Sequence, residues 1–183
     1  MKRLIKVIVF VCIMYYLPAI TINAVPYVEN ESCGKNASYT LSENGVLTIS
    51  GTGEADLGID WEQATMDKAK KIVIEEGITS IAHYGLTGRF VSEIVFPQSL
   101  SRLGEGVLSG YDKMKKAIIP DKVTILPNDT FSSCPILNSI VFPKDLRKIG
   151  NNCFKNCKSL KNLPIPDTVT YIGKNAFKGC KEL

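Results

Sequence analysis

The residues of this chain best suited to chemistry are its cysteines. Cys153 and Cys157 lie four positions apart, and thiolates at such short spacing can hold a metal ion or act as a redox pair. A metal site needs further ligands, but the sequence offers no second C-x-x-C pair and no suitably placed histidine. We therefore predict no metal and no cofactor, and we favour packing as the role of these cysteines.

The other reactive side chains do not assemble a catalytic site either. His83 is the only histidine, and its position beside Tyr84 and Gly85 in an irregular turn favours a structural role. Glu75 and Glu76 form a carboxylate pair, but neighbours in a strand point to opposite faces, so a solvated turn is favoured. Phosphate loops, nucleophile elbows and zinc signatures are absent from the sequence. The sequence predicts a protein that is not an enzyme.

The cysteines instead mark a repeat of 23 residues. Cys134, Cys157 and Cys180 share one register, where a small, weakly polar side chain fits a buried ladder. An earlier copy, residues 72–86, precedes the others at a spacing of 22. About five repeats, the last incomplete, are expected over residues 69–183. The other registers that recur every 23 residues are Pro97, Pro120, Pro143 and Pro166; Leu100, Val123, Leu146 and Val169; Leu103, Leu126, Ile149 and Ile172; and Leu108, Phe131, Phe154 and Phe177.

Each repeat predicts one coil of a solenoid. Leu137, Ile140 and Phe142 fall on one side of a short extended segment, and Pro143, which lacks an N–H, ends that strand. After a second short extended piece, a glycine such as Gly173 is expected to start a single helical or 3-10 turn that carries phenylalanine into the core. A repeat this short cannot bury its own apolar face, so the strands of successive coils must stack in parallel. The expected fold is a β-rich α/β solenoid.

The region before the repeats is predicted to cap this solenoid. Two alternating apolar stretches flank Asn44-Gly45, a strong β-hairpin signal. A short helix over residues 61–70 is expected next, and Trp61 is the expected lid on the open core. Residues 25–68 are therefore assigned as an N-terminal cap made of a hairpin and a helix.

Residues 1–24 have the layout of a secretory signal peptide. Basic residues precede an apolar run over residues 7–17, and cleavage is expected after Ala24. The run is shorter than the ~20 residues of a spanning helix, so cleavage is favoured over a signal anchor. The protein is expected to be secreted or displayed at the cell surface, with membrane attachment only through an uncleaved signal or a missing anchor. Because the chain stops within a repeat, a fragment or a truncated gene product is also expected.

The charge of the chain is uneven. All 18 acidic residues lie beyond Ala24, whereas three of the 22 basic residues belong to the signal segment, so the mature chain is nearly neutral. This balance gives no reason to expect nucleic-acid binding. Residues 25–90 are acidic overall and residues 91–183 are basic. Eight of the basic residues cluster towards the C-terminal end of the chain. A solvated surface is the favoured interpretation of this cluster, and attraction to sulfated glycans is the alternative. The cluster is Lys144, Arg147, Lys148, Lys155, Lys158, Lys161, Lys174 and Lys178.

One outward position in the first strand of each repeat forms an apolar strip. The high β propensity of branched residues explains much of this pattern. The other interpretation is a protein-binding surface, because contiguous exposed apolar surface usually has a partner. The residues of the apolar strip are Val73, Val95, Ile118, Val141 and Pro164.

Two kinds of covalent modification stay open at this level. In a secreted chain the cysteines can form disulfides, and the sequence does not decide between bridged and free thiols. These cysteines are Cys33, Cys134, Cys153, Cys157 and Cys180. Asn30, Asn36 and Asn128 begin N-x-S/T tripeptides and are glycosylation acceptors if the host is a eukaryote.

The repeat pattern L-x-x-I-x-[IF]-P-x-x-[LV]-x-x-I-G-x-x-x-F-x-x-C resembles the BspA-like, or Treponema pallidum type, leucine-rich repeat. Residues 175–180 match its A-F-x-x-C core closely, and residues 33–53 resemble the cap that precedes such repeats in secreted members. Residues 109–111 lack the cysteine, and residues 81–86 lack both the glycine and the phenylalanine. The resemblance implies a surface protein that binds an extracellular protein or host-surface ligand in adhesion. The alternative is a structural or assembly module, or the N-terminal piece of a longer surface protein.

Overall fold

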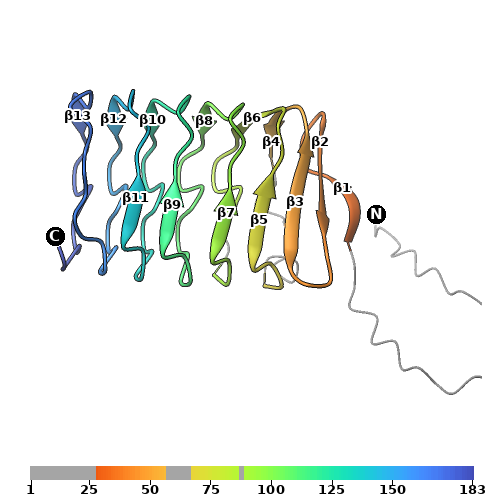
Figure 1. Ribbon diagram of the computed structural model, residues 1–183, viewed down its shortest axis with the longest axis horizontal. Helices are drawn as coiled ribbons and strands as arrows, with labels where there is room; N and C mark the ends of the chain where they lie inside the picture. The colour runs from red at the N-terminus through yellow and green to blue at the C-terminus, as the bar shows by residue number, and fades with distance from the viewer. Residues whose placement is uncertain (1–27, 57–66, 87–88) are drawn as a thin grey trace, which may run out of the picture.

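The computed structural model describes residues 28–56, 67–86 and 89–183, and it leaves the side chains of residues 28–30 undescribed. The predicted signal peptide, Trp61 and the first six residues of the expected helix lie outside the described residues; residues 67–70, its expected end, form a turn and a bend. The described chain winds as a solenoid whose coils follow one another from the cap to the C-terminal end (Figure 1).

Two rows of short strands run along the solenoid (Figure 1). The first row consists of β1 (Val28–Ser32), β2 (Ala37–Leu41), β3 (Val46–Gly51), β5 (Lys71–Ile74), β7 (Glu93–Val95), β9 (Lys116–Ile118) and β11 (Ser139–Val141). The second row consists of β4 (Gly53–Ala55), β6 (Ile78–Ile81), β8 (Arg102–Leu103), β10 (Ile125–Leu126), β12 (Lys148–Ile149) and β13 (Tyr171–Ile172).

The N-terminal hairpin is continuous with the repeats. β2 and β3 pair antiparallel across the turn at Asn44 and Gly45, as the sequence predicts. β3 then pairs in parallel with β5, which places Leu47 opposite Ile72. Both side chains are fully buried. The cap therefore closes the first coil by extending its sheet, and the apolar core continues into the repeats without a boundary.

The aromatic ladder predicted from the 23-residue spacing is confirmed. The rings of Phe131 and Phe154 stack with centroids 5.4 Å apart, and those of Phe154 and Phe177 with centroids 5.5 Å apart. Phe142 meets Phe154 edge-on at 6.0 Å. Stacked and edge-on pairs at these separations add to the stabilisation that burial of the rings already provides.

The predicted helical or 3-10 turn in each coil is absent from the described residues, which contain no helix. No segment of the described chain is therefore a helix able to span a bilayer. The expected segments are turns in which Asp129 and Ser133 adopt positive φ angles of 57° and 61°. Such left-handed residues interrupt a right-handed helix. Their N–H groups also bond across coils, since Asp129 donates to the Asn151 carbonyl at 2.9 Å.

The glycine after the second strand has a different role from the predicted one. A Cβ on Gly150 would lie 2.5 Å from the main-chain carbonyl carbon of Pro127, in the preceding coil. A Cβ on Gly173 would lie 2.5 Å from the Asn151 nitrogen in the same way. Glycine is therefore required because neighbouring coils approach closely at this point, which a side chain would prevent.

One boundary between coils, which we call the seam, carries no strand pairing. β7 and β9 belong to different sheets, and so do β8 and β10. The turns still connect the two coils, because Gly106 donates to the Asn128 carbonyl and Leu108 to the Thr130 carbonyl, both at 3.0 Å. Ala117, on the far side of the seam, occupies the register that Ile140 fills in the next coil. A smaller side chain thus lies at the boundary where the strands of neighbouring coils are no longer paired.

Candidate functional site

The apolar strip lies on the outer face of the first row. Val95, Ile118 and Val141 are 40%, 56% and 44% exposed, Pro164 is exposed and Val73 is half-buried. Strand register places Val73 beside Val95 and Val141 beside Ile118. The strip therefore extends over both sides of the seam, and Ile118, which borders the seam, is more exposed than Val95 or Val141.

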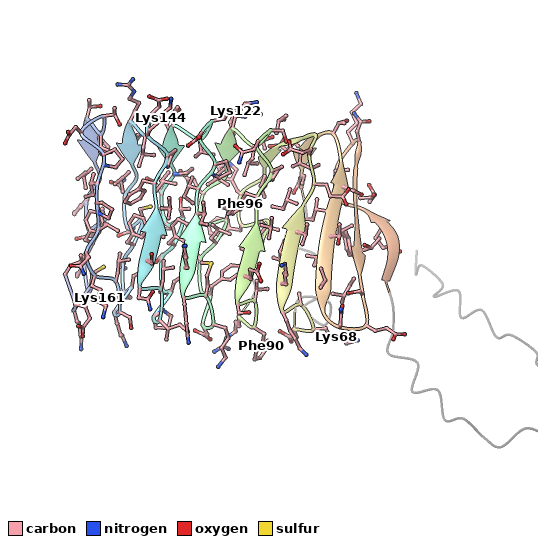
Figure 2. All side chains as sticks on the ribbon, viewed as in Figure 1. Lys68, Phe90, Phe96, Lys122, Lys144 and Lys161 are labelled. Atoms are coloured by element: carbon pink, nitrogen blue, oxygen red, sulfur yellow. The ribbon has the colours of Figure 1, made fainter. Side chains whose placement is uncertain are left out.

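A groove of about 570 Å³ opens in this face at the seam. One wall is built from residues between Ser92 and Gln98 and the other from residues between Lys115 and Asp121, with part of the next coil beyond. Val95, Ile118 and Val141 of the apolar strip line it. So do the half-buried rings of Phe96 and Phe142; Figure 2 labels Phe96 near the middle of this face. The groove was not predicted, because it depends on the loss of strand pairing.

The two ends of the groove carry opposite charge. Lys115 and Lys116 lie where β9 begins, and Asp121 lies just past its end. Among the described residues, none of these three forms an ion pair. Glu93, on the opposite wall, is neutralised by Lys71 at 2.8 Å. The groove thus offers uncompensated cations at one end and an uncompensated anion at the other.

The predicted basic cluster is spread around the last coils. Figure 2 shows Lys144 and Lys161 at opposite edges of the solenoid. Lys148 lies on β12 in the second row, and its Nζ is 5.0 Å from the centre of the Tyr171 ring. Members of the cluster therefore lie on different sides of the coils, and the binding of sulfated glycans stays a prediction.

The ladder cysteines hold neighbouring coils together. Each thiol donates to a carbonyl of the preceding coil: Cys134 to Leu108 at 3.3 Å, Cys157 to Phe131 at 3.1 Å, and Cys180 to Phe154 at 3.1 Å. None of the described cysteines is bridged, and the described residues contain no cluster of three His, Cys, Asp or Glu side chains that could bind a metal ion. Packing was predicted for these residues, whereas the shared hydrogen bond was not.

Tyr111 replaces cysteine in this ladder. It is fully buried, and its hydroxyl donates to the Leu86 carbonyl in the preceding coil. Burial raises the pKa of the Tyr111 hydroxyl well above its usual value, so the group stays a neutral donor. Burial likewise raises the pKa of the Cys153 thiol and brings that of Cys33 to about 11. These are features of packed, unreactive side chains.

Comparison with known proteins agrees with this architecture. A profile of the BspA type leucine-rich repeat region matches residues 64–183 in six copies. The chain belongs to this family. Six copies exceed the five or so that the repeat spacing predicted. No curated protein matches the chain.

Several solved structures share the fold. A leucine-rich cell surface protein from Faecalibacterium prausnitzii matches with a TM-score of 0.58 and 17% identity over 80% of this chain and 51% of its own. The leucine-rich repeat protein of T. pallidum matches with a TM-score of 0.55 and 18% identity, over 79% of this chain and 86% of its own. The pneumococcal vaccine antigen PcpA matches with a TM-score of 0.53 and 15% identity, over 84% of this chain and 47% of its own. The chain thus spans about half the length of the first of these proteins.

The remaining candidates take part in contacts between coils of the BspA-type solenoid. His83 is exposed, and its Nδ1 accepts a hydrogen bond from the Glu105 main chain at 3.2 Å. The carboxylate of Glu76 accepts the N–H groups of Gln98 at 2.7 Å and Ser99 at 3.0 Å. The Gln98 bond is the largest cause of the lowered pKa of Glu76. His83 therefore has the structural role that the sequence favoured, whereas the bonds of Glu76 to the next coil were not predicted, since a solvated turn was expected there.

The three glycosylation acceptors have different surroundings. Asn36 is exposed, and the side chain of Asn30 lies outside the described structure. Asn128 is half-buried and joins three coils: its Nδ2 donates to Glu105 Oε1 at 2.8 Å, and its Oδ1 accepts the Asn151 N–H at 2.9 Å. A glycan on Asn128 would be attached to the nitrogen that makes the first of these bonds and would leave it a single N–H.

Proposed function

We propose that this BspA-type protein acts outside the cell or at its surface and binds an extracellular protein in adhesion. The observation that carries the proposal is the apolar strip: branched side chains at Val95, Ile118 and Val141 stay substantially exposed in adjoining coils and line a groove. Exposed apolar surface that is contiguous usually has a partner. The protein is a binding scaffold and not an enzyme, which agrees with the structural roles of His83 and Glu76.

Surface location has its own support. The predicted signal peptide directs the chain out of the cytoplasm, and the structural neighbour from F. prausnitzii is described as a cell surface protein. The alternative function, a structural or assembly module within a longer surface protein, is supported by the coverage of that neighbour, of which this chain spans 51%. The two functions differ in what covers the strip: a foreign protein or another copy of the same protein.

The test is a binding assay with the mature chain on immobilised matrix proteins and mucins. We expect saturable binding that weakens at least about tenfold in the Val95→Lys, Val141→Lys double variant, because two desolvated ammonium groups in a contact cost more than ~1.4 kcal/mol. Circular dichroism should be unchanged, since both side chains face outward.

The matched control is Ile125→Lys, at a residue that is 49% exposed but lies on β10 in the second row. It should bind like the parent protein. Equal binding by the double variant and the parent would contradict the proposal. Self-association without a foreign partner would favour the assembly module.

A further inference from the structure

We infer that the groove at the seam holds an extended segment of a partner polypeptide, aligned with β7 and β9, with apolar side chains in the hollow and oppositely charged side chains at its two ends. This inference rests on the proposed function, because it describes how the partner of the apolar strip is held. It adds a requirement on the partner that the strip alone does not set: a defined order of charges along an extended chain.

The walls of the groove favour a polypeptide as the occupant. Among the described residues no main-chain hydrogen bond joins β7 to β9, although each strand is paired on its other side with β5 or β11. The facing edges therefore keep main-chain N–H and C=O groups without a strand partner. Because Cα atoms of β7 and β9 approach within 8 Å, less than twice the ~4.8 Å spacing of paired strands, a peptide would reach these groups from the groove and not by insertion between the strands. An extended peptide supplies both donors and acceptors in one chain. An acyl chain supplies neither.

The hollow suits apolar side chains of such a segment. Its volume of about 570 Å³ lies within the ~300–1,000 Å³ that ligand sites usually have. The exposed Val95 and Ile118 line it, together with the half-buried Phe96 and Phe142. Alternate residues of an extended peptide point to the same side, so two apolar residues separated by one position would enter the groove together.

Charge complementarity defines the ends of the segment. Lys115 lies just before β9 and Asp121 lies six positions later, in the turn that follows the strand, so the two are at most about 20 Å apart at ~3.3 Å per residue. Both are exposed and without an ion pair in the described structure. A partner with an acidic and a basic residue six positions apart would place the acid at Lys115 and the base at Asp121.

The experiment uses two blocked, fluorescent heptapeptides and the mature protein at low salt. The first has glutamate at its start, lysine at its end, phenylalanine third, valine fifth and threonine elsewhere; the second has the glutamate and lysine exchanged. We expect one to bind about fivefold more tightly than the other, because each exposed ion pair contributes a small free energy and two are formed or lost together. Equal binding, or no binding by either peptide, would overturn the inference.

A charge exchange in the protein tests the site itself. The variant Lys115→Glu, Asp121→Lys should reverse the preference and bind the other peptide more tightly. The matched control is Lys161→Glu, Asp167→Lys, which exchanges the charges at the same register two coils away from the seam. It should keep the parent preference. A reversal in the control as well, or no reversal in the groove variant, would show that the groove is not the site.

The two proposals fail in different ways. If Val95→Lys, Val141→Lys abolishes binding to the protein partner while neither peptide binds the parent, the strip is a binding surface and the inference about the groove is wrong. If the peptides bind in the expected order but no extracellular protein is bound, the groove stands and the adhesion function is wrong. Absence of both kinds of binding rejects both.

Discussion

The coils before the seam and the coils after it fill the same core position with different side chains. Before the seam the position holds Leu86 and Leu108, both fully buried. After it the position holds Phe131, Phe154 and Phe177, whose rings stack at 5.4 and 5.5 Å. Aliphatic and aromatic coils thus share one main-chain path, and strand pairing is lost where one type meets the other.

The hydrogen bonds between coils show the same contrast. After the seam, cysteine thiols donate to the carbonyl at the core position of the preceding coil, as Cys157 does to Phe131. Next to the seam, the Tyr111 hydroxyl serves the Leu86 carbonyl. A buried carbonyl needs a donor in every coil, but the chemical identity of that donor can change. The fold therefore depends on where apolar and donor groups stand, and less on which residues supply them.

The largest expected effect on stability comes from the stacked phenylalanines in the coils after the seam. Phe154→Ala should lower the free energy of unfolding by about 3–5 kcal/mol, because it removes a fully buried ring that contacts rings on both sides. Phe154→Leu, which copies the coils before the seam, should cost less, about 1–3 kcal/mol, because it keeps part of the buried apolar volume but loses both stacked pairs. Urea unfolding of the mature chain, followed by circular dichroism, measures both. A larger loss for leucine than for alanine would contradict the view that the two kinds of coil are interchangeable.

Much of this comparison could be predicted from the sequence. The register of Phe131, Phe154 and Phe177 follows from their spacing alone, since a coil of constant length returns each side chain to the same place. The predicted helical turn was wrong because the spacing carries no information about backbone angles. Asp129 and Asn152 adopt positive φ, which asparagine and aspartate tolerate better than most residues, and these residue types were the available signal.

The candidate site was only partly predictable. Strand periodicity placed Val95 and Val141 on the outer face, because alternate residues of a strand share a face. The groove beside them lies where β7 and β9 are not paired, and residues of more than one coil line it. In the sequence, alanine at 117 is one substitution within a regular repeat and does not indicate that two rows of strands lose their pairing.

A smaller effect is expected from removing single donors. Tyr111→Phe should cost about 1–3 kcal/mol in unfolding free energy, because the buried Leu86 carbonyl loses its hydroxyl partner. Cys157→Ala should cost a similar amount, since it removes the donor to the Phe131 carbonyl. Tyr171→Phe is the control: Tyr171 is 49% exposed, so the change should stay within about 0.5 kcal/mol. A neutral Tyr111→Phe beside a costly Cys157→Ala would show that the two donors are not equivalent.

The smallest expected effect is a difference in how acid changes the stability of the coils before the seam and of the coils after it. Before the seam, the turn after the first strand is held by the Glu76 carboxylate, which accepts the N–H groups of Gln98 and Ser99 in the next coil. After the seam, the Thr168 hydroxyl holds the corresponding turn by donating to the carbonyls of Lys144 and Leu146. Only the first of these contacts contains a group that titrates.

The folded-state pKa of Glu76 lies below its ordinary value of 4.5. Its contribution to stability is therefore present above about pH 4.5 and is lost as the pH falls through the folded-state pKa. We expect Glu76→Gln to lower the urea midpoint at pH 7 and to match the parent once the carboxyl group is protonated in both states. Thr168→Val should lower the urea midpoint by the same amount at pH 7 and at pH 2, because the threonine hydroxyl does not titrate in this range. A Glu76→Gln difference that persists unchanged at pH 2 would show that the amide, and not the loss of charge, causes the destabilisation.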